Sequence, residues 1–141
     1  MTELTKKKIT LSWIKNLQFL AEDEHGHSIV LDTDIDGGGN NSGFRPLDLL
    51  LVSLAGCMSM DIVAIVKKKG GRISSFKMIL EGERSKEHPK RFVKINYKII
   101  CQGDYKDEDL QRAFELSRDK YCSVLHTIKN PPAIEFEIGR E

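Results

Sequence analysis

A long stretch rich in apolar residues, from Leu47 to Lys69, constrains this chain more than any other feature. The stretch has no internal proline, and its apolar side chains fall on nearly every face of a helix. A helix that is apolar all round needs to be buried on several sides. Pro46 suits the first turn, where its missing N–H would have no partner, and lysines followed by Gly70 are typical of a helix end. The sequence therefore predicts a long, buried central helix over residues 46–69.

Segments on either side of this helix have the alternation or the flanking turns that predict β-strands. The first three form an N-terminal β-meander, the next two a β-hairpin, and the last a C-terminal strand. They are Ile9–Lys15, Gln18–Glu22 and His27–Thr33 before the helix, then Arg72–Arg84, Arg91–Gln102 and Ala133–Gly139 after it. The glycine-rich stretch Asp34–Gly43 is expected to be an exposed loop, because glycine loses much chain entropy when it is ordered.

The segment Asp107–Tyr121 is amphipathic and predicts a second helix, which Cys122–Lys129 continues or restarts before Pro131 ends it. Strands grouped before and after helices, with long hairpins, indicate the α+β class rather than a doubly wound parallel sheet. The length of 141 residues suits a single domain over 1–141. One small sheet cannot cover a helix as apolar as 46–69, so we expect a homodimer in which a second copy covers the remaining faces.

Charge and composition exclude several classes of partner. The formal net charge of +1 provides no long-range field for binding nucleic acid or an anionic membrane. Asp48 and Asp61 within the apolar stretch disfavour a membrane span. No apolar run follows the lysines of Met1–Lys8, so no secretory signal is expected. The three cysteines form no CxxC pair and no metal-ligand spacing, and their odd number without a secretory signal indicates a reducing, cytoplasmic location.

Two of the three cysteines are candidates for chemistry. Cys101 falls on the apolar face of a predicted strand and is expected to be an inert, buried residue. Cys57 lies in the central helix beside small residues such as Gly56, so both a core role and a functional role remain open. Asp61 lies one helical turn after Cys57, where a carboxylate disfavours a thiolate.

Cys122 follows Arg118 and Lys120 and stands at a predicted helix start. The positive end of a helix dipole is expected to help its thiol ionise there. His126 shares its helix face, although a surface histidine is a better interpretation than a catalytic base. Spacing alone cannot establish that Cys57 and Cys122 meet, because their pairing would be a tertiary contact.

Two motifs carry a family resemblance. The stretch Gly43–Val63 reads GFRPLDLLLVSLAGCMSMDIV and contains a loop, a proline and a cysteine-bearing helix. The stretch Ser117–Val124 reads SRDKYCSV and contains the second cysteine. Together the two motifs resemble those of the OsmC/Ohr family, and their details are similar to its YhfA-type branch of OsmC-like proteins. The resemblance covers nearly the whole chain.

This resemblance implies an intertwined α+β homodimer that reduces organic hydroperoxides, as a defence against oxidative stress. Cys57 would attack the peroxide as a thiolate and become a sulfenic acid, and Cys122 would condense with it to a disulfide. A dithiol reductant would then reopen the disulfide. The resemblance implies no metal and no organic cofactor.

Further site residues follow from the same resemblance. Better-characterised branches have a glutamate directly after the proline and an early arginine near the thiolate, whereas here the acid is Asp48, one position further on. The candidates for stabilising the thiolate are therefore Arg45, Asp48 and Lys15, with a charge at the helix N-terminus as the alternative role for Asp48. An apolar substrate pocket is expected to be lined by Leu50, Leu54 and Met58.

Two other functions remain open on the sequence. One is a non-catalytic protein that binds a small apolar ligand or senses redox stress through the same cysteines. The other is a structural dimer whose buried thiols are inert. Turnover of an alkyl hydroperoxide, lost when Cys57 is replaced, would separate the enzyme from both.

Overall fold

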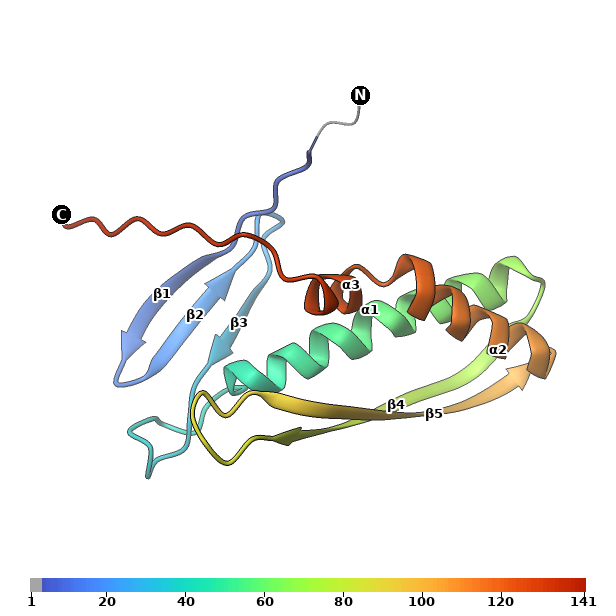
Figure 1. Ribbon diagram of the computed structural model, residues 1–141, viewed down its shortest axis with the longest axis horizontal. Coiled ribbons are helices and arrows are strands. Elements are labelled where there is room, and N and C mark those ends of the chain that lie inside the picture. Colours follow the sequence, from blue (N-terminus) through green and yellow to red (C-terminus); the bar gives the residue numbers. More distant parts are fainter. Residues whose placement is uncertain (1–3) are drawn as a thin grey trace. The chain divides into compact units, whose positions relative to one another are not determined.

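The computed structural model describes residues 4–141, so the first residues of the Met1–Lys8 segment lie outside the described residues. The chain divides into two compact units, Met1–Leu50 and Leu51–Glu141. Figure 1 colours the elements of both units in chain order. The expectation of a single domain over 1–141 stays a prediction.

The first unit contains a three-stranded antiparallel sheet. Its strands are β1 (Thr10–Lys15), β2 (Gln18–Glu22) and β3 (Ser28–Leu31), in the spatial order β1-β2-β3 (Figure 1). Phe19 in the middle strand pairs with Trp13 on one side and with Leu31 on the other. The predicted meander is confirmed, and β3 is shorter than the expected range.

A buried carboxylate orders the glycine-rich loop that follows β3. Asp32 is only 2% exposed, and its oxygens accept hydrogen bonds from the backbone N–H groups of Thr33, Asn40 and Ser42. The Ser42 hydroxyl also donates to it, at 2.6 Å. Gly39 is required in this loop because a Cβ there would collide with the carbonyl oxygen of Thr33. The predicted loop is confirmed, but it is held in place by side-chain hydrogen bonds.

The helix α1 spans Pro46–Lys68 and confirms the predicted central helix. Asp48 in its first turn and lysines in its last turn complement the helix dipole. Gly70, with a φ of 90°, ends the helix in the left-handed conformation that glycine favours. By length and composition alone, α1 is apolar enough to cross a membrane.

One stripe of α1 is buried within the second unit. The stripe consists of residues one helical turn apart, Leu54, Met58, Ile62 and Val66. Other apolar side chains of α1 are exposed, by 47% for Val52, 75% for Met60 and 38% for Val63. The chain itself therefore covers only part of a helix that is apolar on most sides.

A long antiparallel hairpin provides the surface on which this stripe packs. It consists of β4 (Arg72–Arg84) and β5 (Phe92–Asp104), and its register runs from Arg72 opposite Asp104 to Arg84 opposite Phe92. Figure 1 shows α1 and α2 (Asp107–Leu116) on the same side of this hairpin. One buried cluster joins Ile62 and Val66 of α1 with Ala113 of α2. The predicted hairpin is confirmed.

The predicted helix over Asp107–Tyr121 is only partly correct. It is α-helical as far as Leu116, and Ser117–Tyr121 then form a π-helical turn, η1. The turn is wider because the Cys122 N–H donates to the Ser117 carbonyl oxygen, at 2.8 Å, across five residues instead of four. The helix α3 (Ser123–Lys129) restarts after Cys122.

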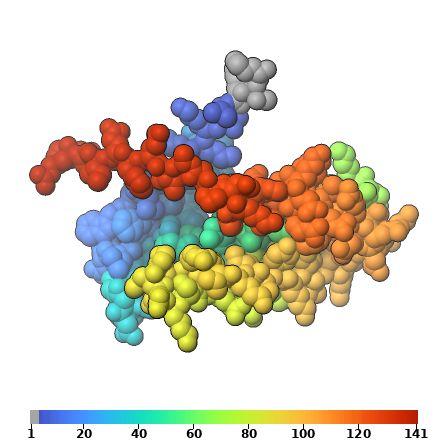
Figure 2. All heavy atoms as spheres, in the orientation of Figure 1, coloured from blue at the N-terminus to red at the C-terminus, as the bar shows by residue number. Residues whose placement is uncertain are grey.

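The predicted strand over Ala133–Gly139 is wrong. The segment is irregular, and its alternating apolar residues Ile134, Phe136 and Ile138 are 71%, 89% and 97% exposed. Figure 2 shows it, in red, extending from α3 as a single chain. A strand exists only where a neighbouring strand takes its backbone hydrogen bonds, and no described segment pairs with this one.

Candidate functional site

The structure brings Cys57 and Cys122 together in the second unit. Both lie in one apolar cluster, where Cys122 is fully buried beside Leu54 and Met58 and Cys57 is half-buried against them. Both are free thiols, and Cys57 lies close enough to Cys122 to contribute to the raised pKa of its thiol. The tertiary contact that spacing could not establish is therefore present.

Cys122 occupies the junction between η1 and α3. Its backbone N–H closes the π-helical turn, while its sulfur accepts a hydrogen bond from the Leu125 N–H, at 3.4 Å, and so caps α3. We expected this helix start to help the thiol ionise, and the N–H groups of Leu125 and Val124 do lower its pKa, but they are not the largest effect. Burial raises the pKa of the Cys122 thiol above its ordinary value, because the loss of water outweighs the hydrogen bond that favours the thiolate.

Aromatic residues enclose the buried side of the thiol pair. Tyr97 on β5 packs against the cluster, and burial raises the pKa of its hydroxyl. Its ring lies 5.9 Å from that of Phe114 on α2, centroid to centroid. The Arg118 guanidinium lies over the Phe114 ring, 5.3 Å from its centre, and donates to the Asp119 carboxylate. Of the two cations that precede Cys122 in the sequence, Arg118 is thus neutralised by its neighbour Asp119.

Asp61, one turn after Cys57 on α1, contacts the segment that carries Cys122. Its Oδ2 accepts a hydrogen bond from the Ser117 hydroxyl, at 2.8 Å. Ser117 is fully buried and begins η1. The sequence indicated Asp61 only as a carboxylate near a thiol. Nothing in the spacing indicated Ser117 as its partner, because Ser117 lies far from Asp61 along the chain.

The other residues expected at the site are distributed over both units. Leu54 and Met58 are buried in the thiol cluster, whereas Leu50 belongs to the first unit and is half-buried there. Their role in a substrate pocket stays a prediction.

The expected thiolate-stabilising residues all belong to the first unit. Arg45 is half-buried and its Nη1 donates to the Gly43 carbonyl oxygen, at 3.4 Å, while Asp48 and Lys15 are exposed. Each unit is ordered by itself, and the role of these three residues at Cys57 stays a prediction.

Two further residues considered in the sequence have clear positions. Cys101 is half-buried on β5, and its carbonyl oxygen accepts a hydrogen bond from the Tyr105 hydroxyl, at 2.9 Å. His126 is half-buried, not the surface residue that we expected, and its Nε2 is buried without a hydrogen-bond partner in the described part of the chain. Within residues 4–141, no three side chains of His, Cys, Asp or Glu gather as the ligands of a metal ion would.

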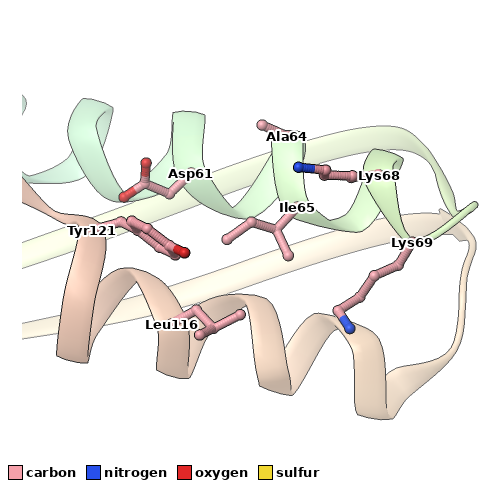
Figure 3. A pocket seen from close by; sticks show the side chains of 7 residues that line it. All are labelled: Asp61, Ala64, Ile65, Lys68, Lys69, Leu116 and Tyr121. Carbon is pink, nitrogen blue, oxygen red and sulfur yellow. The ribbon is translucent and has the colours of Figure 1, made fainter.

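A pocket of about 510 Å³ lies along α1 on the side of α2 and η1. Figure 3 shows its lining, with Asp61 and Lys68 projecting from α1 and Leu116 and Tyr121 from the opposite segment. Asp61 is one turn from Cys57, and Tyr121 directly precedes Cys122. The pocket therefore lies next to the thiol pair, although neither cysteine lines it.

Comparison with known proteins agrees with these features. The family model described as OsmC-like protein matches residues 38–137, which include both cysteine motifs. Protein YhfA of Escherichia coli (strain K12) is 35% identical over 115 residues, covering 81% of this chain and 83% of its own. The resemblance noted in the sequence is confirmed.

Solved structures share the same fold. A hypothetical protein from Aquifex aeolicus VF5 is 32% identical, with a TM-score of 0.79 over 91% of this chain and 90% of its own. An organic hydroperoxide resistance protein from Legionella pneumophila has a TM-score of 0.60 over 92% of this chain and 93% of its own, at 17% identity. The mixed α+β architecture is thus that of OsmC-like structures, and the chain belongs to the OsmC-like protein family.

Proposed function

We propose that this protein reduces organic hydroperoxides with its two thiols, Cys57 and Cys122, at the expense of a dithiol. The observation that carries the proposal is the close approach of these two free thiols inside one apolar cluster. Thiols in contact are placed to form a disulfide, which a catalytic cycle of this kind requires.

In the first step, Cys57 attacks as a thiolate. An S–O bond forms and the peroxide O–O bond breaks, so the sulfur is oxidised to a sulfenic acid and the peroxide is reduced to an alcohol. Two observations favour Cys57 over Cys122 for this step. Cys57 is the more accessible of the two, and burial raises the pKa of Cys122, which keeps that residue in its thiol form.

In the second step, the Cys122 sulfur attacks the Cys57 sulfenic acid. An S–S bond forms, the S–O bond breaks, and the Cys122 proton leaves with the hydroxyl group as water. An external dithiol then reduces the disulfide by exchange and is itself oxidised to a disulfide. The apolar residues around the thiols favour an alkyl peroxide over hydrogen peroxide.

A protein with the same fold supports the proposed peroxide reduction. The Legionella pneumophila protein that shares this architecture is described as an organic hydroperoxide resistance protein. In our proposal, Arg45, with Lys15 as the alternative, supplies the positive charge beside the Cys57 thiolate, and Asp48 orients that charge. Leu50, Leu54 and Met58 form the apolar wall of the substrate site.

The proposal includes a homodimer located in the cytoplasm. Val52, Met60 and Val63 leave an apolar face of α1 exposed, and a second copy of the chain would cover such a face. A reducing compartment would keep the thiols free between cycles. Light scattering should give twice the mass of one chain, and the mass of a single chain at micromolar concentration would contradict the dimer.

The decisive experiment measures consumption of cumene hydroperoxide with dithiothreitol as the reductant. The wild-type protein should turn over, and Cys57→Ser should fall to the uncatalysed rate because it lacks the attacking sulfur. Cys101→Ser is the matched control and should keep full activity. Absence of turnover in the wild type, or full activity of Cys57→Ser, would refute the proposal. A wild-type disulfide without turnover would instead favour a redox sensor.

A further inference from the structure

Ser117 makes two hydrogen bonds that connect the segments of the two thiols. Its hydroxyl donates to Asp61 Oδ2, at 2.8 Å, and its carbonyl oxygen accepts from the Cys122 N–H, also at 2.8 Å. The residue is fully buried, so these groups have no water as an alternative partner. Ser117 therefore joins the helix of Cys57 to the residue Cys122 itself.

Asp61 lies where a restraint on its own position also restrains Cys57. The two residues are one turn apart on α1 and share a face, as the helical repeat requires. Figure 3 shows Asp61 on α1 and Tyr121, the last residue of η1, on opposite walls of one pocket. A hydrogen bond across this boundary opposes sliding or rotation of η1 along α1.

The π-helical turn explains why such a restraint is needed. A bond across five residues places Cys122 one residue further from its acceptor than an α-helix would. Such π-helical turns are rare in proteins, but those that occur are frequently at functional sites. In a regular α-helical turn the Cys122 side chain would point in a different direction, because each residue rotates the helix by about 100°. Ser117 is the residue at which this irregular turn begins.

We propose that the hydrogen bond between Ser117 and Asp61 is a positioning device that sets Cys122 against Cys57 for disulfide formation. This inference rests on the proposed function. Ser117 and Asp61 touch no reacting atom in this scheme, so both are positioning residues. Their effect falls on the second step of the cycle and not on the first.

The consequence is a competition for the Cys57 sulfenic acid. In one outcome it condenses with the Cys122 thiol and releases water. In the other, a second hydroperoxide molecule oxidises it to a sulfinic acid and is reduced to an alcohol. A well-placed Cys122 makes the first outcome fast, so the Ser117–Asp61 hydrogen bond determines how much peroxide the protein tolerates before it is inactivated.

The test is Ser117→Ala, with Ser123→Ala as the matched control on the other side of Cys122. Ser123 is exposed and has no part in the proposed bond. In rapid-mixing experiments with cumene hydroperoxide, Ser117→Ala should oxidise Cys57 at the wild-type rate. Disulfide formation should slow by about tenfold to a hundredfold, the cost of a misplaced reacting group. Mass spectrometry should find more sulfinic acid on Cys57, and Ser123→Ala should match the wild type in both steps.

Variants of Asp61 separate the hydrogen bond from the charge. Asp61→Asn keeps an oxygen that accepts the Ser117 hydroxyl, so its disulfide should form at the wild-type rate. Asp61→Ala removes the acceptor and should slow disulfide formation as much as Ser117→Ala does. The double variant Ser117→Ala, Asp61→Ala should be no slower than either single variant, because both remove the same bond.

Two results would overturn the inference while leaving the proposed function intact. One is disulfide formation within twofold of the wild type in both Ser117→Ala and Asp61→Ala. The other is an equal slowing of both steps with a lowered melting temperature, which shows a general loss of structure. Failure of the wild-type protein to form any disulfide would refute the proposed function itself.

Discussion

The two compact units of this chain are held together by different interactions. Among the described residues up to Leu50, the buried side chain is a carboxylate, that of Asp32, and all of β1 is exposed. From Leu51 onward, the buried residues are mainly apolar and belong to two clusters that link α1 to the hairpin and to α2. The first unit is organised by a polar network and the second by packing.

Because the two units are stabilised differently, they should respond differently to pH and to the truncation of side chains. Apolar packing depends little on pH but is sensitive to the removal of a few methylene groups. A carboxylate that accepts several hydrogen bonds depends strongly on its own ionisation. The thiol pair combines both properties, because it lies in the packed unit but contains a group that can titrate.

The largest effect is expected from Met58→Ala in the second unit. Met58 is fully buried between the thiols and the hairpin, so its truncation should lower the free energy of unfolding by about 2–5 kcal/mol. Lys86→Ala, in the turn of the same hairpin, is the control, since Lys86 is exposed, and its loss should stay below about 0.5 kcal/mol. Urea unfolding under reducing conditions measures both, and equal losses would contradict the contrast between the two positions.

An intermediate effect is expected in the first unit when the pH is lowered. Hydrogen bonds from the Ser42 hydroxyl and from nearby backbone N–H groups lower the pKa of Asp32 from 3.8 to about 2. The stabilisation of the loop is therefore complete above pH 3.8 and is lost as the pH falls toward about 2. Amide chemical shifts of Thr33, Asn40 and Ser42 should follow this transition.

The same shifts should change in Asp32→Ala at neutral pH, because that variant lacks the carboxylate altogether. Asp36→Ala, an exposed acid of the same loop, is the control and should leave them unchanged. A wild-type loop whose amide shifts stay constant down to about pH 2 would show that the carboxylate does not organise it.

The smallest effect concerns the thiol site at alkaline pH. Because burial raises the pKa of Cys122, the folded state favours its neutral form, and this contribution is present below the ordinary thiol pKa. The free energy of unfolding of the reduced protein should then fall as the pH rises from 9.0 toward 10.0, below the range in which Tyr97 titrates. Cys122→Ala should flatten that slope and Cys101→Ala should not. A slope that persists in Cys122→Ala would assign it to another group.

Much of the fold was predictable because its signals are local. Pro46 and Gly70 mark the ends of α1 through backbone geometry, and the alternation in Phe92–Asp104 marks a strand through side-chain direction. Both cysteines were predicted as the candidate site from their motifs. Their contact was not predictable from spacing, since it depends on how the η1 segment packs against α1.

The misjudged features all depend on neighbours that are distant in sequence. The raised pKa of Cys122 follows from burial by residues of β4, β5 and α1, which outweighs the effect of its own helix start. The π-helical turn at Ser117 has no sequence pattern that distinguishes it from an α-helical turn. Its buried partner, Asp61, lies in another helix.

Two segments share the same alternating pattern of apolar residues but differ in structure. Phe92–Asp104 is a strand because β4 lies beside it, whereas Ala133–Gly139 has the same pattern and is paired with no described segment. The amino-acid sequence is enough to tell which residues favour helical or extended conformations, and where the reactive sulfurs lie along the chain. The packing of the folded chain is needed to tell which extended segment becomes a strand, which sulfur is buried, and that the two thiols lie close together. Hydrogen-bond partners, burial and electrostatic environment belong to pairs of segments, and no single segment contains them.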